Sequence, residues 1–368
     1  MSGPSIPFLD LQPGDDAALV RRAIDRVLAR GWFVLGPEVD AFEAEFAAAS
    51  GARFAVGVAS GTDAIALLLR AAGIERGDEV LVPAITAAYT ALAVISAGAT
   101  PIIVDVEGDT LTMDAAACET AITSRTRAMV PVHLYGQAAD MAALRAVADR
   151  HHLAIVEDCC QAHLATERGV PVGTIGVGGA FSFYPTKNLA ALGDGGAVIT
   201  NDAAIAERVR RLRNGGQTER YRHVDDGVNS RLDEIQAAVL RERLPLLPYW
   251  TSMRRALAAR YRAMLPAAVR AIAERDRGHV HHLFPIRSPR RDALRDHLAT
   301  EGIDALIHYP YPLSAQPAFA RFHPAECPVA ACACSELLSL PLHPRLTERQ
   351  QDRVVAAVAS FERGHVQA

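Results

Sequence analysis

The chain has 368 residues, half of which are apolar, and its formal charge is −4. This size allows a large buried core in two or three domains, and the charge offers no basic field for nucleic acid. Apolar runs predict strands at 55–58, 80–82, 102–105, 128–133, 154–157, 179–183 and 197–200, with helices between them. This alternation predicts an α/β fold in which a mostly parallel sheet is covered by helices on both faces.

The pattern changes after residue 240. Pro245 and Pro248 flank a break, which is followed by a helical run through Arg262 and a strand-like stretch at 281–287. We therefore expect a large domain at residues 1–245, which includes an N-terminal arm, and a smaller C-terminal α/β domain at residues 246–368.

No charged residue occurs between Val80 and Val104, a length that is in principle enough to span a bilayer. However, Pro83, Gly98 and Pro101 divide the stretch into a strand, a helix at about 86–97 and a second strand, as in a soluble crossover unit. The N-terminus also lacks the charged and apolar blocks of a signal peptide. We expect a cytoplasmic protein with no membrane partner.

An acid and a lysine follow two of the predicted strands. Asp158 comes after the run at 153–156, and Lys187 stands between an aromatic stretch at 181–184 and a glycine-rich turn at 193–196. A lysine amine can hold the aldehyde of pyridoxal phosphate (PLP) as a Schiff base, and a carboxylate can keep the pyridine nitrogen protonated. Either residue alone is more typical of a surface charge or a helix cap, but the ordered pair favours catalysis.

A phosphate site is predicted where Gly61 and Thr62 precede a helix-like run at 64–70. Small residues that open a helix present free backbone amides to an anion, and the Thr62 hydroxyl adds another donor. A simple helix cap by Ser60, Thr62 or Asp63 is the alternative. Ser182, close to the lysine in sequence, is a second candidate phosphate hydroxyl.

Together with further motifs, these residues resemble the sugar aminotransferases of the DegT family, a branch of the fold-type-I PLP enzymes with the aspartate-aminotransferase-like fold. The resemblance runs nearly end to end. Its motifs are Gly31-Trp32-Phe33-Val34-Leu35-Gly36-Pro37-Glu38, His133-Leu134-Tyr135-Gly136-Gln137, Gly227-Val228-Asn229-Ser230-Arg231-Leu232-Asp233-Glu234, His308-Tyr309-Pro310 and Leu340-Pro341-Leu342-His343-Pro344, in addition to those above.

The resemblance implies a homodimer with shared active sites and assigns roles to single residues. His163 receives no proton-transfer role, since a structural imidazole is an equal alternative. The implied cofactor residues are Lys187 for the Schiff base, Asp158 for the pyridine nitrogen, Gln161 for the ring hydroxyl, Gly61, Thr62 and Ser182 for the phosphate, and Asn229 for the phosphate of the other subunit.

The chain departs from the family pattern at two places. Many relatives carry an aromatic residue soon after the proline that corresponds to Pro83, where it stacks on the cofactor ring. Here Tyr89 does this from a shifted position or is a helix core residue, and both interpretations stay open. The stretch 163–165 also lacks the usual glycine, which suggests a locally altered loop.

The resemblance implies amino transfer from L-glutamate to a nucleotide-linked keto sugar by a ping-pong mechanism, with a 3-keto-6-deoxyhexose favoured. Tyr184, Arg220, His308 and Tyr309 are similar to positions that line the sugar pocket, although Arg220 is equally well explained as a solvated loop charge. The alternatives are a 4-keto sugar, a PLP sugar enzyme without transamination, or a non-enzymatic regulator. The intact set of Lys187, Asp158 and Gln161 argues against the last two.

Six cysteines are present, but they lack paired CxxC spacing. Free thiols are the simplest interpretation. The histidines near 279–282 have no completing set of ligands, so we predict no structural metal.

Overall fold

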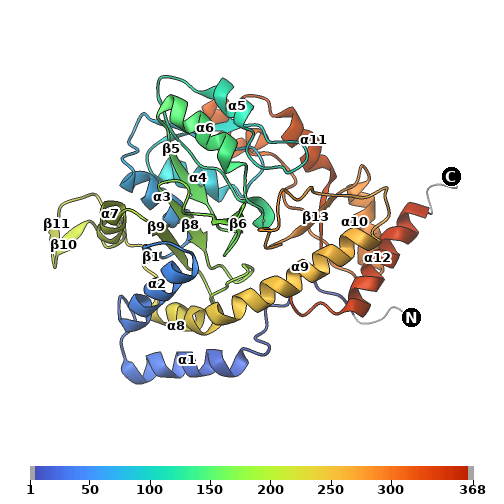
Figure 1. The fold of residues 1–368 in the computed structure, drawn as a ribbon, viewed down its shortest axis with the longest axis horizontal. Helices are drawn as coiled ribbons and strands as arrows, with labels where there is room; N and C mark the ends of the chain where they lie inside the picture. The colour runs from blue at the N-terminus through green and yellow to red at the C-terminus, as the bar shows by residue number, and fades with distance from the viewer. Residues whose placement is uncertain (1–4, 364–368) are drawn as a thin grey trace.

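The structure, a computed structural model, describes residues 5–363 and has a seven-stranded sheet at its centre (Figure 1). The strand order is β1-β9-β8-β5-β4-β2-β3. Only β9 runs antiparallel to its neighbours, so the predicted mostly parallel sheet is confirmed. The strands are β1 (Phe54–Val58), β2 (Glu79–Pro83), β3 (Thr100–Val104), β4 (Thr126–Met129), β5 (Ala154–Asp158), β8 (Gly178–Ser182) and β9 (Gly196–Thr200).

Helices cover both faces of this sheet, as the sequence predicts. Successive strand residues point to opposite faces: Val80 and Val82 pack into one core, whereas Leu81 packs into another. The first face is covered by α3 (Gly61–Ala71), α4 (Tyr89–Ser96) and α7 (Ala203–Arg213), and the second by α2 (Pro37–Ala49), α5 (Ala115–Ala121), α6 (Met141–His151) and α8 (Glu234–Arg243), with α1 (Ala17–Arg30) outside α8.

Polar side chains fix the start of two of these helices. Ser60 caps α3 by accepting a hydrogen bond from the Asp63 amide (3.1 Å), so the expected helix cap is present. At α2 the cap comes from a distant segment, because the buried carboxylate of Glu234 accepts from three amides at residues 36–39, at 2.8–3.0 Å. A negative charge at the N-terminus of a helix also interacts favourably with the positive end of the helix dipole.

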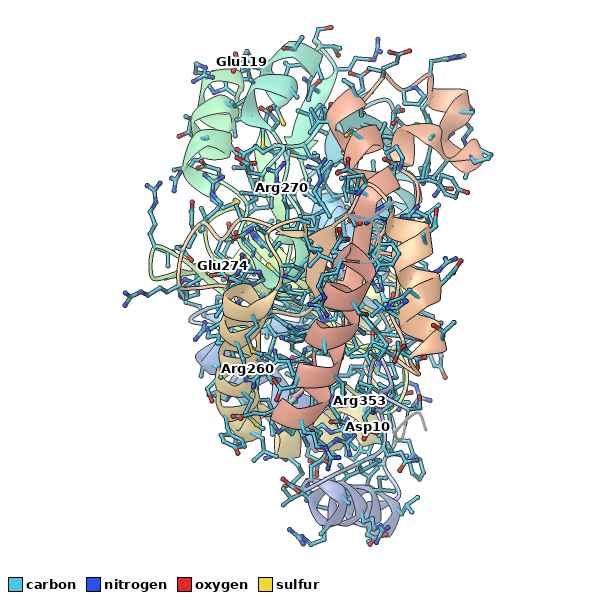
Figure 2. The ribbon with its side chains drawn as sticks, turned by 90° about the vertical axis from the view of Figure 1, so that its right-hand side faces the viewer. Asp10, Glu119, Arg260, Arg270, Glu274 and Arg353 are labelled. Atoms are coloured by element: carbon cyan, nitrogen blue, oxygen red, sulfur yellow. The ribbon has the colours of Figure 1, made fainter. Side chains whose placement is uncertain are left out.

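The C-terminal part has a core of its own, built on a three-stranded antiparallel sheet. Figure 2 views this part from the side of α9 and α12, which carry the labelled Arg260 and Arg353. The expected strand at 281–287 begins only at Phe284, because the amide of His282 bonds elsewhere, to the Tyr135 carbonyl. The elements are α9 (Leu247–Met264), β12 (Arg270–Ala271), β13 (Phe284–Arg287), α10 (Arg291–Thr300), β14 (Leu337–Leu340) and α12 (Glu348–Arg363).

The large sheet and the C-terminal part each receive a segment from the other end of the chain. Ile6, near the N-terminus, pairs with Ile303 and packs into the C-terminal core. Helix α11 (Pro328–Glu336), in turn, buries Ala330 in the core of the large sheet. The N-terminal arm therefore lies on the C-terminal part, and the domain boundary near residue 245 stays a prediction.

The uncharged stretch at 80–104 folds as β2, α4 and β3, as expected for a crossover unit, although α4 begins three residues late, at Tyr89. Within residues 5–363, no helix combines the length and the apolar composition that crossing a membrane requires. Two short hairpins complete the fold: β6 (Thr166–Glu167) with β7 (Val170–Pro171), and β10 (Gln217–Glu219) with β11 (Arg222–His223).

Candidate active site

Asp158 ends β5 and is buried beneath the start of α4. Its Oδ2 accepts a hydrogen bond from the Thr90 hydroxyl (2.8 Å), and its Oδ1 accepts one from the Cys160 amide (3.1 Å). The Thr86 hydroxyl lies 2.9 Å from that of Thr90 and extends this network. The carboxylate is thus held by neutral donors, and within the described part of the chain no cation forms an ion pair with it.

Lys187 lies in the loop between β8 and β9, with its backbone amide bonded to the Tyr184 carbonyl (2.8 Å). The amine is withdrawn from water, which lowers the pKa of Lys187, while the nearby Cys160 and Asp158 act in the opposite direction. A larger fraction of the amine is therefore neutral at physiological pH than for a surface lysine. The structure brings together the two residues on which the catalytic interpretation depends.

Buried histidines surround this amine. Burial lowers the pKa of His163 to about 3 and that of His308 to about 4, and it lowers the pKa of His282 well below its usual value. The charge of Lys187 is the second cause in each case, which shows how closely the rings approach it. All three imidazoles are neutral at pH 7.

His163 makes contacts that support the structural interpretation. Its Nε2 hydrogen-bonds to the Ser182 carbonyl (2.8 Å), and its ring packs between Phe181 and Phe183. It therefore holds the end of β8 and needs no role in proton transfer.

Gln161 and Tyr309 form a second side of the site. The Gln161 side-chain amide donates to the Tyr309 hydroxyl at 3.0 Å. Burial raises the pKa of Tyr309, so its phenol stays protonated. The neighbouring His308 stacks on Phe8 of the N-terminal arm, and its Nδ1 lies 3.0 Å from the Ser339 hydroxyl.

The predicted phosphate residues also meet. The start of α3 is packed so closely against β8 that a Cβ on Gly61 would lie 2.6 Å from the Cys160 sulfur and 2.7 Å from the Ser182 Cβ. Only glycine permits this approach. Thr62 is the next residue of the same helical turn, so the N-terminus of α3 begins directly beside Ser182.

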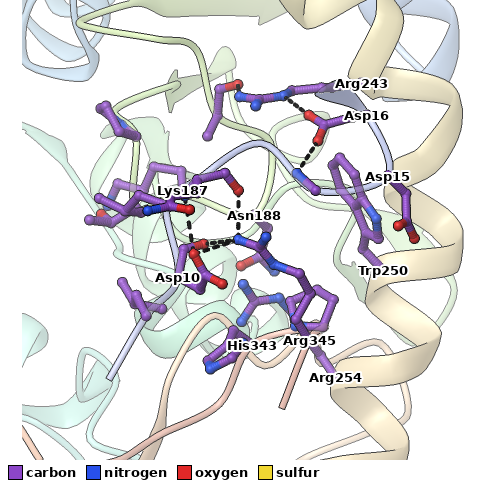
Figure 3. A pocket seen from close by; sticks show the side chains of 18 residues that line it. Asp10, Asp15, Asp16, Lys187, Asn188, Arg243, Trp250, Arg254, His343 and Arg345 are labelled. Atoms are coloured by element: carbon purple, nitrogen blue, oxygen red, sulfur yellow. Dashed lines mark hydrogen bonds and ion pairs between the residues drawn. The ribbon is translucent and has the colours of Figure 1, made fainter. Parts of the chain in front are cut away.

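A pocket of about 140 Å³ adjoins Lys187 on the side of the N-terminal arm (Figure 3). Two ion pairs of 2.7 Å hold the arm in place, Asp16 with Arg243 and Asp10 with Arg345. The arm thereby covers the loop that carries the lysine.

The structure leaves four predicted residues at the surface. Tyr89 is 64% exposed at the first position of α4, so it is not a helix core residue, and its stacking role stays a prediction. Tyr184 is half exposed beside the lysine loop. Arg220 lies on the β10–β11 hairpin, which projects from the large sheet (Figure 1), with its guanidinium 5.0 Å from the Tyr221 ring. Asn229 is exposed in the segment that follows this hairpin.

His133, Glu157 and Cys159 form a buried group with the spacing of metal ligands. The Nδ1 of His133 accepts from the Ala139 amide (3.1 Å), so its Nε2 carries the hydrogen and donates to Glu157 (3.0 Å). The carboxylate also accepts from three amides in the loop 173–176. These four donors occupy both oxygens, so the group is a hydrogen-bonded support behind Asp158. All six cysteines, which lie in the described part of the chain, are free.

Sequence reasoning missed Thr86 and Thr90, because a threonine at the start of a helix is commonplace. A usable signal was present, since a buried carboxylate requires donors and α4 follows β2, a parallel strand of the same sheet. Tyr135 was noted only as part of a motif.

The sheet, the helices on both its faces, the buried Asp158 at the end of β5 and Lys187 in the loop after β8 define an α/β enzyme with the aspartate-aminotransferase-like fold. The chain belongs to the DegT/DnrJ/EryC1/StrS aminotransferase family, whose profile matches residues 15–359. The predicted family is thereby confirmed.

Several known proteins are similar over nearly the whole chain. The dTDP-3-amino-3,4,6-trideoxy-alpha-D-glucose transaminase of Streptomyces venezuelae is 51% identical, with 97% of this chain and 96% of the relative covered. The crystal structure of S. venezuelae DesV in complex with a ketimine intermediate has a TM-score of 0.95 at 49% identity, over 98% and 99% of the two chains. That of ntda from Bacillus subtilis with bound cofactor PMP has a TM-score of 0.92 at 30% identity, over 99% and 86%.

Proposed function

We propose that the protein is a PLP-dependent aminotransferase that moves the amino group of L-glutamate to a nucleotide-linked 3-keto-6-deoxyhexose in a ping-pong reaction. The observation that carries this proposal is the buried carboxylate of Asp158, which has only neutral donors, beside a lysine with a lowered pKa. The similarity to a transaminase named for a 3-amino sugar supports the position of the keto group.

The residues fit the cofactor. A buried carboxylate without an ion-pair partner favours a cationic group, and a protonated pyridine nitrogen supplies one. Gln161 would donate to the ring hydroxyl, and Gly61, Thr62 and Ser182 would hold the phosphate at the start of α3. When bound, PLP forms a Schiff base with an amine and withdraws electrons from the carbon next to that amine.

Lys187 carries the proton transfers. Burial lowers the pKa of Lys187, which favours the neutral amine that a base requires. Lys187 removes a proton from the α carbon of the amino donor. In the second half of the reaction it returns a proton to the sugar carbon that receives the amine.

His308 and Tyr309 exclude water from the site and add no charge to it. Both are half-buried, and their shifted pKa values leave the imidazole and the phenol neutral at pH 7. Neither competes with Lys187 for the proton. We place them, with Tyr184, along the sugar.

Arg220 and Asn229 require a second copy of the chain to reach a site. Both are exposed on or beside the β10–β11 hairpin, and a homodimer would let them contact the sugar nucleotide and the cofactor phosphate of the partner. Exposed Leu28 in the last turn of α1, and Trp32 and Phe33 on the connection from α1 to α2, support such an interface. We place this dimer in the cytoplasm and keep residues 1–245 and 246–368 as its two domains.

The test is amination of defined sugars. The protein with PLP and L-glutamate is offered matched 3-keto and 4-keto nucleotide sugars, and mass spectrometry detects the amino sugar and 2-oxoglutarate. We expect the 3-keto sugar to react at least about tenfold faster. Exclusive use of the 4-keto sugar would overturn the assigned position, and amination of neither sugar would overturn the function.

A further inference from the structure

Tyr135 is a buried residue with an uncommon backbone conformation. It lies in the short 3-10 turn Leu134–Gly136 after β4, only 2% exposed, with φ 58° and ψ 9°. A bulky residue adopts this left-handed conformation only where its surroundings enforce it. The proposed function gives this residue no role.

Each polar group of Tyr135 binds a different segment. Its amide donates to Oε1 of Gln161 (2.7 Å), its carbonyl accepts from the His282 amide (2.8 Å), and its phenol donates to the His308 carbonyl. Burial raises the pKa of the Tyr135 phenol well above its usual value, so this donor is present at every physiological pH.

These contacts close a ring around the site. An amide N–H at Tyr135 requires an acceptor, so Oε1 of Gln161 faces it and Nε2 turns toward the Tyr309 hydroxyl, 3.0 Å away. Tyr309 is bonded in sequence to His308, which accepts from the phenol of Tyr135. Tyr135 therefore contacts both the amide of Gln161 and the 308–309 segment, which Ser339 and Phe8 also hold.

The turn has no room to move away. A Cβ on Gly136, which has a φ of +96°, would lie 2.9 Å from the His282 amide nitrogen. The Gly136 carbonyl also accepts from the Val280 amide at 2.9 Å. The turn and the segment 280–282 are thus packed directly against each other.

We propose that Tyr135 is a positioning residue that couples the amide of Gln161, on the cofactor side, to His308 and Tyr309, on the substrate side. The effect on turnover rests on the proposed function, whereas the mechanical coupling does not. Loss of the phenol removes one of the contacts that hold the 308–309 segment, so it weakens sugar binding more than it affects the amino donor.

The first test compares Tyr135→Phe with Tyr261→Phe. Tyr261 is also fully buried, and its phenol donates to the Pro341 carbonyl (3.0 Å), within the C-terminal core. We expect Tyr135→Phe to raise the KM for the keto sugar roughly five- to tenfold, as for the loss of one hydrogen bond. The KM for L-glutamate and the visible spectrum of the PLP-loaded protein should change less than about twofold. Tyr261→Phe should change none of these values.

The second test uses the protein without cofactor. Hydrogen exchange, followed by mass spectrometry, should be roughly fivefold faster at residues 305–311 in Tyr135→Phe and unchanged there in Tyr261→Phe. Unchanged exchange in Tyr135→Phe, an equal change in both variants, or an unchanged sugar KM would overturn the coupling. Faster exchange in a protein that aminates no sugar would support the mechanical coupling while the proposed function fails.

Discussion

The Thr90 hydroxyl donates to Oδ2 of Asp158 at 2.8 Å, with both groups buried. The Thr86 hydroxyl lies 2.9 Å from the Thr90 hydroxyl, within hydrogen-bonding distance. A carboxylate that accepts such bonds is held in a single orientation. The start of α4 thus determines which way Asp158 faces.

Removing this donor should weaken cofactor binding. Thr90→Val keeps the shape of the side chain and removes the hydroxyl, and a hydrogen bond to a charged group is worth about 1.5–3 kcal/mol. We expect the Kd for PLP to rise roughly tenfold or more, measured by absorbance titration. Thr86→Val, one step further from Asp158, is the matched control and should have a smaller effect. Equal effects of the two variants would contradict the role of Thr90.

Lys187→Ala should abolish turnover without harming the fold. Loss of the positioned base removes a contribution of roughly 10²–10⁴ in rate, and covalent attachment of PLP is lost as well. Because burial disfavours the charged amine, the cofactor-free variant should melt at the same temperature as the parent protein or higher. Differential scanning calorimetry and the amination assay check the two halves. Measurable turnover by Lys187→Ala would refute the assignment.

The buried histidines should make the protein sensitive to acid. The folded-state pKa of His163 is about 3, lowered mainly by burial, against about 6.5 in an unfolded chain. The unfolded state therefore binds more protons between these values, and stability falls as the pH falls below 6.5. In urea titrations between pH 6 and 4, the slope for His163→Asn should be shallower than that of the parent by up to about 1.4 kcal/mol per pH unit. Identical slopes would mean that His163 is protonated in the folded state.

Glu234 should be important for stability through the cap it gives to α2. Glu234→Gln removes the negative charge and places an NH₂ group among three amide donors, so we expect a loss of about 1–3 kcal/mol in unfolding free energy. Glu207→Gln, on the exposed surface of α7, is the control and should change stability by less than about 0.5 kcal/mol. A loss no larger than that of the control would show that the cap contributes little.

The large sheet was predictable because its strands are short apolar runs between helical patterns. Asp158 and Lys187 were predictable because parallel strands bring the ends of distant segments together. The course of the N-terminal arm was not, since the pairing of Ile6 with Ile303 joins residues almost 300 positions apart and leaves no local pattern. A chain folds such segments by long-range packing, which single-sequence periodicity does not record.

Within the site, too, local contacts were predictable and long-range contacts were not. The cap on α3 follows from local sequence around Ser60, and the structure confirms it. Tyr135 gave no local signal, because its importance comes from three partners at positions 161, 282 and 308. The role of Asn229 involves a second copy of the chain, and Arg220 lies on an exposed hairpin, so the roles of both stay predictions.

The central claim is that Lys187 and Asp158 hold PLP and exchange its aldehyde for the amino group of L-glutamate. The most direct measurement is the visible absorption spectrum of the purified protein with PLP, before and after L-glutamate. We predict a yellow band that is absent in Lys187→Ala and that bleaches when glutamate is added. A band that is missing in the parent protein, or one that glutamate leaves unchanged, would contradict the claim.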